Sequence, residues 1–436
     1  MNVAIEGCAW VLRCAACLRP FQVTDGHCSC PDCGGLLDVE RSSAWDDPTE
    51  LRARFASRSF IDGPARDRSG VWRYRDLLFD VPEKCVVTLP EGNTPLVRHE
   101  RVTSYAGVAE LAMKHEGMNP TASFKDRGMT AGVSQAMSLG AKAVACASTG
   151  NTSASLAAYA ARAGIPAYVF VPAGQVALGK LTQTLAYGAR TILVHGDFDA
   201  CLALVQDVSK RLGIYLLNSV NPFRIEGQKT IAIELMHQLA WNPPDWIALP
   251  AGNLGNTAAI GKALRELAEC GLIPRVPRIL AVQAEGASPF AQSYATQFST
   301  RRVVRAETIA TAIRIGNPAS HDRAVHAIRA TDGVVLSVPD AEILEAKAVI
   351  DGSGIGCEPA SAAGVAGVRA AVARGLVGPG QSVVAILTGH VLKDPGVLSW
   401  YHRELEPRPW LANRPVEAEA SVEVIERLLN QSWPER

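Results

Sequence analysis

The chain has 436 residues, of which 48% are apolar and 20% are charged, and its 43 basic residues balance its 43 acidic ones. This length is enough for two or three domains with substantial buried cores. The charge balance argues against nucleic acid or an anionic membrane surface as a partner. Apolar runs stay well short of the roughly 18 residues of a membrane span, and the first 13 residues lack the pattern of a signal peptide. We therefore expect a soluble cytoplasmic protein.

Six of the eleven cysteines fall within residues 8–33. Four of them form two Cys-x2-Cys pairs, namely Cys14 with Cys17 and Cys30 with Cys33. Two such pairs can supply the four thiolates of a tetrahedral, structural Zn²⁺ site. His27 and Cys28 lie close enough in the chain to replace a ligand, and a chance cluster of buried or redox thiols is the alternative. We predict a small zinc ribbon over residues 1–40.

The composition and hydrophobic pattern of the chain change twice after this ribbon. Residues 41–90 are polar and charged, which predicts a connecting arm. From residue 91 onward, apolar β-like runs alternate with helical patterns over some 300 residues, which predicts an α/β fold with mainly parallel sheets. We assign this core to residues 91–410, with a smaller inserted subdomain at about 130–225, and a helical tail to residues 411–436.

The individual elements follow from these runs. Strands are expected at residues 108–113, 142–147, 166–171, 190–194, 246–249, 279–283 and 383–387. Helices are expected at residues 124–139, 152–163, 199–212 and 257–267, several of them followed by glycine, as helix ends often are.

Lys125 lies between the first of these strands and the first helix. Most lysines at a helix start are solvated surface residues. Here, however, a turn rich in Asn, Pro, Thr and Ser precedes the lysine, and open α/β sheets hold their ligands at such strand-to-helix junctions. A lysine that loses its proton there can form a Schiff base with an aldehyde cofactor.

Three other turns also follow apolar strand patterns. Residues 148–152 (Ser-Thr-Gly-Asn-Thr) offer an amide and several hydroxyls, although they would also suit a plain helix N-cap. Residues 252–256 (Gly-Asn-Leu-Gly-Asn) would let backbone N–H groups approach a phosphate at a helix N-terminus, although an ordinary βα loop can have this composition. Thr388 ends the last strong strand and, taken alone, would be a turn residue.

The lysine segment and these turns resemble, in the same order, those of the threonine synthases, which carry pyridoxal phosphate (PLP) on the matching lysine. The resemblance covers roughly residues 85–400 and implies the fold of type II PLP enzymes, with two open α/β domains. It also implies a homodimer. It makes Lys125 the catalytic residue. The cofactor-binding residues that it implies are Lys125, Asn151, Gly252, Asn253, Leu254, Gly255, Asn256 and Thr388.

Each turn has its own role in this resemblance, because the protein must orient and tune the cofactor. Asn151 is expected to contact the ring oxygen, residues 252–256 the phosphate, and Thr388 the ring nitrogen. A hydroxyl does not force protonation of that nitrogen, which suits elimination and replacement chemistry.

The resemblance also implies a site for a phosphorylated amino acid. Its implied substrate-binding residues are Ser148, Thr149, Thr152, Ser219 and Arg224. A guanidinium recognises phosphate oxygens bidentately, and in the family the matching serine and arginine hold the phosphate of O-phosphohomoserine. Asn253 is expected to help. On pattern alone, residues 218–230 could equally be a helix-capping loop with a surface arginine.

The reaction that the resemblance implies is γ-elimination of phosphate followed by β-addition of water, giving L-threonine. The alternatives are replacement of the phosphate of O-phosphoserine, as in cysteate synthesis, a serine or threonine ammonia-lyase, and a zinc-ribbon interaction protein that has lost its activity. Two residues depart from the family pattern, because Ala122 and Val391 stand where glycine is common.

Overall fold

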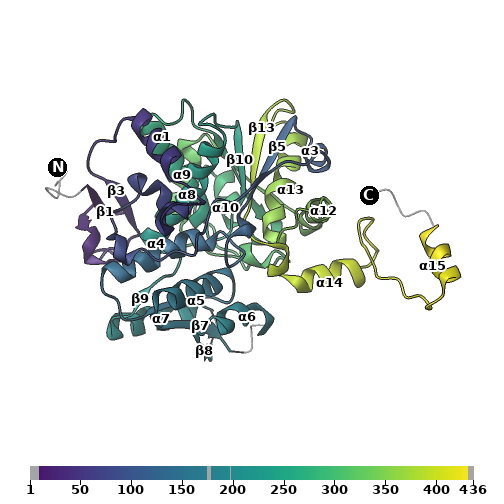
Figure 1. Ribbon diagram of the computed structural model, residues 1–436, viewed down its shortest axis with the longest axis horizontal. Helices are drawn as coiled ribbons and strands as arrows, with labels where there is room; N and C mark the ends of the chain where they lie inside the picture. Colours follow the sequence, from purple (N-terminus) through teal and green to yellow (C-terminus); the bar gives the residue numbers. More distant parts are fainter. Residues whose placement is uncertain (1–8, 174–177, 197, 431–436) are drawn as a thin grey trace.

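The computed structural model describes residues 9–173, 178–196 and 198–430. Three separate sheets organise these residues, and helices cover the two larger ones (Figure 1). The predicted α/β class with mainly parallel sheets is confirmed. Within the described ranges, every helix is too short or too polar to cross a membrane.

The first sheet is antiparallel and lies at the N-terminal end. Its order is β2 (Pro20–Gln22), β1 (Trp10–Cys14) and β3 (Leu37–Arg41). The elements that follow up to residue 90 are short: α1 (Pro48–Ser57), α2 (Ala65–Arg68), η2 (Trp72–Leu77) and η3 (Glu83–Cys85). Trp72 and Tyr74 are buried, so this segment packs firmly on the core.

The second sheet has six strands and is parallel except at one edge. Its order is β12 (Val334–Val338), β11 (Arg278–Ala284), β10 (Trp246–Pro250), β13 (Ser382–Leu387), β5 (Glu110–His115) and β4 (Leu96–Val97). Only β4 runs antiparallel to its neighbour. All five residues of β10 are buried, as expected for a central parallel strand covered on both faces.

Helices cover both faces of this sheet. One face packs on α3 (Glu100–Ala106), α12 (Asp340–Asp351) and α13 (Pro359–Ala373). The other packs on α8 (Pro222–Gln238), α9 (Gly255–Glu269) and α11 (His321–Ala330). The shorter α10 (Pro289–Ala295) contacts β12 at the edge.

The third sheet is parallel throughout and has the order β8 (Arg190–Val194), β7 (Ala167–Pro172), β6 (Val144–Ala147) and β9 (Tyr215–Leu216). Its helices are α4 (Lys125–Ser138), α5 (Asn151–Ala163), α6 (Leu178–Ala186) and α7 (Phe198–Leu212). Helix α4 also packs on α8, so it joins the two parallel sheets.

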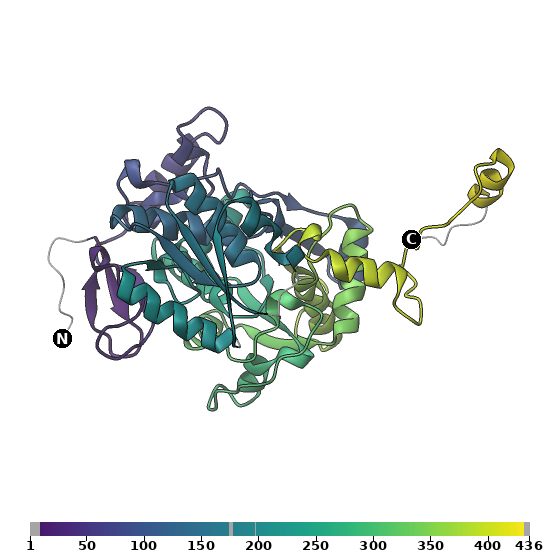
Figure 2. The ribbon, with the colours of Figure 1, turned by 90° about the horizontal axis from the view of Figure 1, so that it is seen from below.

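The predicted strands are confirmed to within two residues at each end, and the predicted helices overlap α4, α5, α7 and α9. In the two larger sheets no strand was predicted at β4, β9 or β12, and the predicted helices did not include α8. The chain ends with α14 (Pro395–Arg403) and α15 (Val422–Leu429), and α15 lies apart from the body in both views (Figures 1 and 2).

Candidate active site

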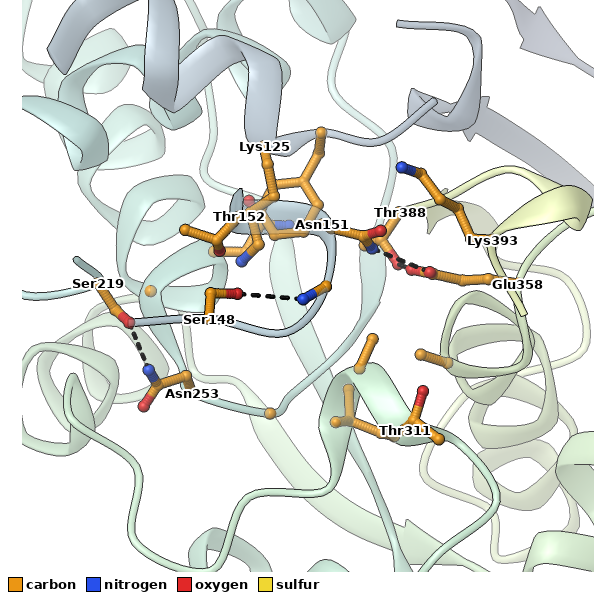
Figure 3. A pocket seen from close by; sticks show the side chains of 18 of the residues that line it. Lys125, Ser148, Asn151, Thr152, Ser219, Asn253, Thr311, Glu358, Thr388 and Lys393 are labelled. Atoms are coloured by element: carbon orange, nitrogen blue, oxygen red, sulfur yellow. Dashed lines mark hydrogen bonds between the residues drawn. The ribbon is translucent and has the colours of Figure 1, made fainter. Parts of the chain in front are cut away.

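A cavity of about 840 Å³ lies where strands of the two parallel sheets end. Every residue predicted to bind a cofactor or substrate lines it: Lys125, Ser148, Thr149, Asn151, Thr152, Ser219, Arg224, Gly252, Asn253, Leu254, Gly255, Asn256 and Thr388. Figure 3 shows many of these side chains converging from separate loops. The segments are far apart in the chain, and the carboxyl ends of parallel strands bring them together.

Lys125 is the first residue of α4, and the backbone before it is tied to the end of β13. Phe124 N donates to Thr388 O at 3.0 Å, and His390 N donates to Ala122 O at 3.0 Å. Ala122 has φ +64°, a left-handed conformation that glycine adopts without the cost of a Cβ. This conformation explains why glycine is common at this position in the family pattern.

The Lys125 amine has the electrostatics of a base. Burial, followed by the positive charge of Arg224, lowers the pKa of Lys125 to about 7, while Glu358 acts in the opposite direction. The ammonium form is disfavoured because it is poorly solvated. The amine lies 4.3 Å from the centre of the Phe124 ring. A substantial fraction of this lysine is therefore neutral near pH 7.

Glu358 connects two of the predicted cofactor residues. Its carboxylate accepts from Asn151 Nδ2 at 3.0 Å and from Thr388 Oγ1 at 3.1 Å (Figure 3). Ser361 Oγ lies 2.9 Å from the same threonine oxygen. Burial raises the pKa of Glu358 above its usual range. The sequence alone predicted no role for this glutamate, because its partners are distant in the chain.

The turn before α9 forms a polar cradle. Leu254 has φ +64°, which turns the chain sharply into the helix. The buried Asn256 side chain has no hydrogen-bond partner on either polar atom, and neither has Thr257 Oγ1, among the described residues. Such orphaned groups are costly unless a ligand satisfies them. Their place in the first turn of a helix favours an anion.

Arg224 and Ser219 occupy the loop and helix start after β9. Arg224 is 1% exposed. Its Nη1 donates to Leu217 O at 3.2 Å, while its Nε has no partner in the described part of the chain. Burial lowers the pKa of Arg224 to about 10. Asn253 Nδ2 donates to Ser219 Oγ at 2.6 Å, which joins the two predicted phosphate-binding loops.

A buried ionic network fixes α4 behind Lys125. Arg127 pairs with Glu116 at 2.7 Å and with Glu234 at 2.8 Å, and Lys114 pairs with Glu234 at 2.5 Å. All four side chains are at most 1% exposed. Buried charges are tolerated only when paired in this way. The network holds the start of α4 on α8 and includes no contact with Lys125.

The four predicted metal ligands form a cluster outside this cavity. The sulfur atoms of Cys14, Cys17, Cys30 and Cys33 all lie within 4.8 Å of one another. Cys28 is not a member of this cluster, because its thiol faces Leu216 and Asn221 instead.

The chemistry of the residues around the cavity fits PLP. A neutral lysine can bond the aldehyde, and the orphaned amide and hydroxyl of Asn256 and Thr257 can take the phosphate. Asn151 and Thr388 both donate to Glu358 and offer polar groups that a pyridine ring could contact.

Comparisons with known proteins agree with this geometry. Residues 87–389 match the family model described as "Pyridoxal-phosphate dependent enzyme". The threonine synthase of Methanosarcina acetivorans is 46% identical over 88% of this chain and 92% of its own. That of Methanocaldococcus jannaschii is 42% identical over 96% and 99%.

Solved structures give the same fold. Threonine synthase from Escherichia coli superposes with a TM-score of 0.69 at 16% identity, covering 96% of this chain and 94% of its own. A fungal L-serine ammonia-lyase from Rhizomucor miehei gives 0.63 at 23% identity, over 72% and 98%. The fold therefore does not choose the reaction, whereas the sequence relatives do. The chain belongs to the pyridoxal-phosphate dependent enzymes and, among them, to the threonine synthase family.

Proposed function

We propose that this protein converts O-phospho-L-homoserine and water into L-threonine and phosphate. The observation that carries the proposal is the arginine Arg224, buried without a carboxylate partner among the described residues, in the same cavity as Lys125, whose pKa is lowered to about 7. An ammonia-lyase acting on serine or threonine would have no phosphate to place against it.

The site supports a division of labour among its residues. Arg224 and Ser219, with Asn253, bind the substrate phosphate. Ser148, Thr149 and Thr152 bind the remainder of the amino acid.

The turn from Gly252 to Asn256 binds the cofactor phosphate, while Asn151 and Thr388 orient the ring. When bound, PLP supplies the aldehyde that captures the substrate amine and the ring that accepts electrons. These assignments follow from the shared cavity and the chemistry of each side chain.

Lys125 serves as the base and acid of the reaction. With the substrate bound, the free amine of Lys125 would remove and return protons at Cα and Cβ. A pKa of about 7 suits both directions of transfer at neutral pH. Phosphate leaves from Cγ toward Arg224, and water adds at Cβ.

The departures from the family pattern do not oppose this function. Ala122 and Val391 are not among the described residues that line the cavity. Val391 packs against Gly356 instead.

The test is phosphate release from O-phosphohomoserine and from O-phosphoserine, with the amino-acid product identified. Release from the first substrate with L-threonine as product is the expected result. No release from it, with release from O-phosphoserine, would replace the proposal by the alternative of β-replacement.

We also propose that Cys14, Cys17, Cys30 and Cys33 hold a structural Zn²⁺. Cys14 Sγ lies 3.5 Å from Cys33 Sγ, and Cys17 Sγ lies 3.7 Å from Cys30 Sγ. Tetrahedral ligands about 2.3 Å from Zn²⁺ lie about 3.8 Å apart. One equivalent of zinc by elemental analysis, lost on Cys30→Ala, is expected.

Of the remaining proposals, the dimer rests on the family resemblance, and the location and domain division rest on composition and sequence pattern. These proposals are a cytoplasmic homodimer and the division into a ribbon (1–40), an arm (41–90), a catalytic core (91–410, with a subdomain at about 130–225) and a tail (411–436). Light scattering of the purified protein tests the dimer.

A further inference from the structure

Cys28 lies between β2 and β3 of the N-terminal sheet. It contacts the segment between β9 and α8, which contains Ser219 and leads to Arg224. Its Sγ lies 3.5 Å from Leu216 O. Asn221 Nδ2 donates to the same sulfur at 3.4 Å and to Leu216 O at 3.0 Å. The thiol therefore lies beside the first and last residues of a six-residue segment, 216–221, that contains Ser219.

Asn221, which contacts Cys28, also contacts the start of the helix that contains Arg224. Its Oδ1 accepts from Phe223 N at 3.0 Å and caps α8, a role for which asparagine is well suited. Arg224 lies in the first turn of that helix and donates to Leu217 O at 3.2 Å. The hydrogen bonds of Cys28 and Asn221 therefore end at Leu216 and Phe223, the chain neighbours of the acceptor Leu217 and of Arg224 itself.

The same sheet contacts α8 a second time. Lys229 Nζ lies 5.4 Å from the centre of the Trp10 ring. Lys229 also pairs with Glu226 and Glu266, both at 2.7 Å, and Lys262 pairs with Glu226 at 2.6 Å. This buried set of charges ties α8 to α9, and the hydrogen bonds of Asn221 and Arg224 hold the start of α8.

We propose that Cys28 is a positioning residue, through which the N-terminal sheet fixes Ser219 and Arg224 for the phosphate of the substrate. The inference rests on the proposed function only for the identity of that phosphate ester. It gives the N-terminal sheet a role in substrate affinity, although no described residue of that sheet lines the cavity. A contact that only stabilised the fold would leave phosphate affinity unchanged in the folded enzyme.

The variants are Cys28→Ala, which removes the acceptor, and Cys28→Ser, which keeps a smaller one. Cys85→Ala is the matched control, because Cys85 is also a half-buried free cysteine but lies in η3. Each is purified with its cofactor. Zinc content and cofactor absorbance are recorded, and the dissociation constant of inorganic phosphate is measured by calorimetric titration.

We expect Cys28→Ala to weaken phosphate binding about three- to tenfold, the range for one lost hydrogen bond. KM for O-phosphohomoserine should rise by the same factor while kcat changes less than twofold. Cys28→Ser should recover most of the loss, and Cys85→Ala should behave as wild type. Zinc and cofactor content should not change.

Wild-type phosphate affinity in Cys28→Ala, or an equal loss in Cys85→Ala, would overturn the inference. If Cys28→Ala does not fold, Asn221→Ser replaces it, since serine still caps α8 but cannot reach Cys28, and the same loss is expected. Failure of the proposed function is distinguishable, because wild type would then fail to turn over O-phosphohomoserine while phosphate titration still reports on Cys28.

Discussion

Arg224 has opposite effects on the stability of the protein and on its binding of phosphate. Burial lowers the pKa of Arg224 to about 10, which corresponds to about 3 kcal/mol of unfavourable desolvation, at roughly 1.4 kcal/mol per pKa unit. A cation whose folded-state pKa lies below its unfolded value destabilises the fold at every pH below both values. At neutral pH, the whole cost is present in the phosphate-free protein.

Arg224→Gln removes this charge and should therefore stabilise the phosphate-free protein. The variant also loses the hydrogen bond to Leu217 O, worth about 1 kcal/mol. We expect the free energy of unfolding to rise by about 1–2 kcal/mol, measured by urea denaturation without phosphate. Arg265→Gln is the control, because Arg265 is half-exposed on α9 and should change stability little.

Phosphate binding should respond in the other direction. A bound phosphate supplies the partner that Arg224 lacks among the described residues, so about 3 kcal/mol is regained on binding. Arg224→Gln should therefore weaken inorganic phosphate binding and lower kcat/KM about 100-fold. A variant that is less stable than wild type and still binds phosphate normally would refute the assignment of this charge to the ligand.

Three further predictions concern Lys125, Glu358 and the turn that precedes α4. Uptake of PLP by the cofactor-free protein should accelerate as pH rises through about 7, because only the neutral Lys125 amine reacts; absorbance follows it, and a flat profile from pH 6 to 9 contradicts it. Glu358→Ala leaves the donors of Asn151 and Thr388 without this acceptor, so PLP affinity should fall about tenfold or more, as equilibrium dialysis would show. Ala122→Gly should raise the urea midpoint slightly, by relief of about 1 kcal/mol at φ +64°; a lower midpoint would contradict it.

The sequence was sufficient for the framework of the site. The alternation of apolar runs and helical patterns predicted seven strands correctly, and the polar turns after them predicted which residues would meet. This works because the carboxyl ends of parallel strands converge regardless of the details of packing. The conformation of Ala122 also agrees with a pattern in which glycine is usual.

What the sequence did not reveal depends on contacts between distant residues. Glu358 lies 207 residues from Asn151, and its own segment, Glu-Pro-Ala-Ser before a helix, does not show which side chains the carboxylate meets. The strand β12 is short, with five residues of which four are buried, and α8 is buried so completely that it has no exposed polar face. Periodicity cannot identify a helix that is covered on all sides.

The start of α4 shows why charge patterns are poor guides to exposure. Lys125, Asp126 and Arg127 would ordinarily be taken as a solvated helix end, yet all three serve the interior. Asp126 accepts from Thr121 N at 2.6 Å and Ser155 Oγ at 2.6 Å, and burial raises its pKa to about 6. Arg127 is fully paired by carboxylates.

Lys125 differs from Arg127 because no carboxylate among the described residues forms an ion pair with it. The hydrogen bonds of Asp126 and the ion pairs of Arg127 fix the backbone on either side, so that the lysine amine can be neutral without becoming mobile. A salt bridge to Lys125 itself would hold it equally well but would raise its pKa and abolish its nucleophilicity. The fold therefore places the ion pairs of Arg127 two residues from the reactive amine, which positions that amine and leaves it free to react.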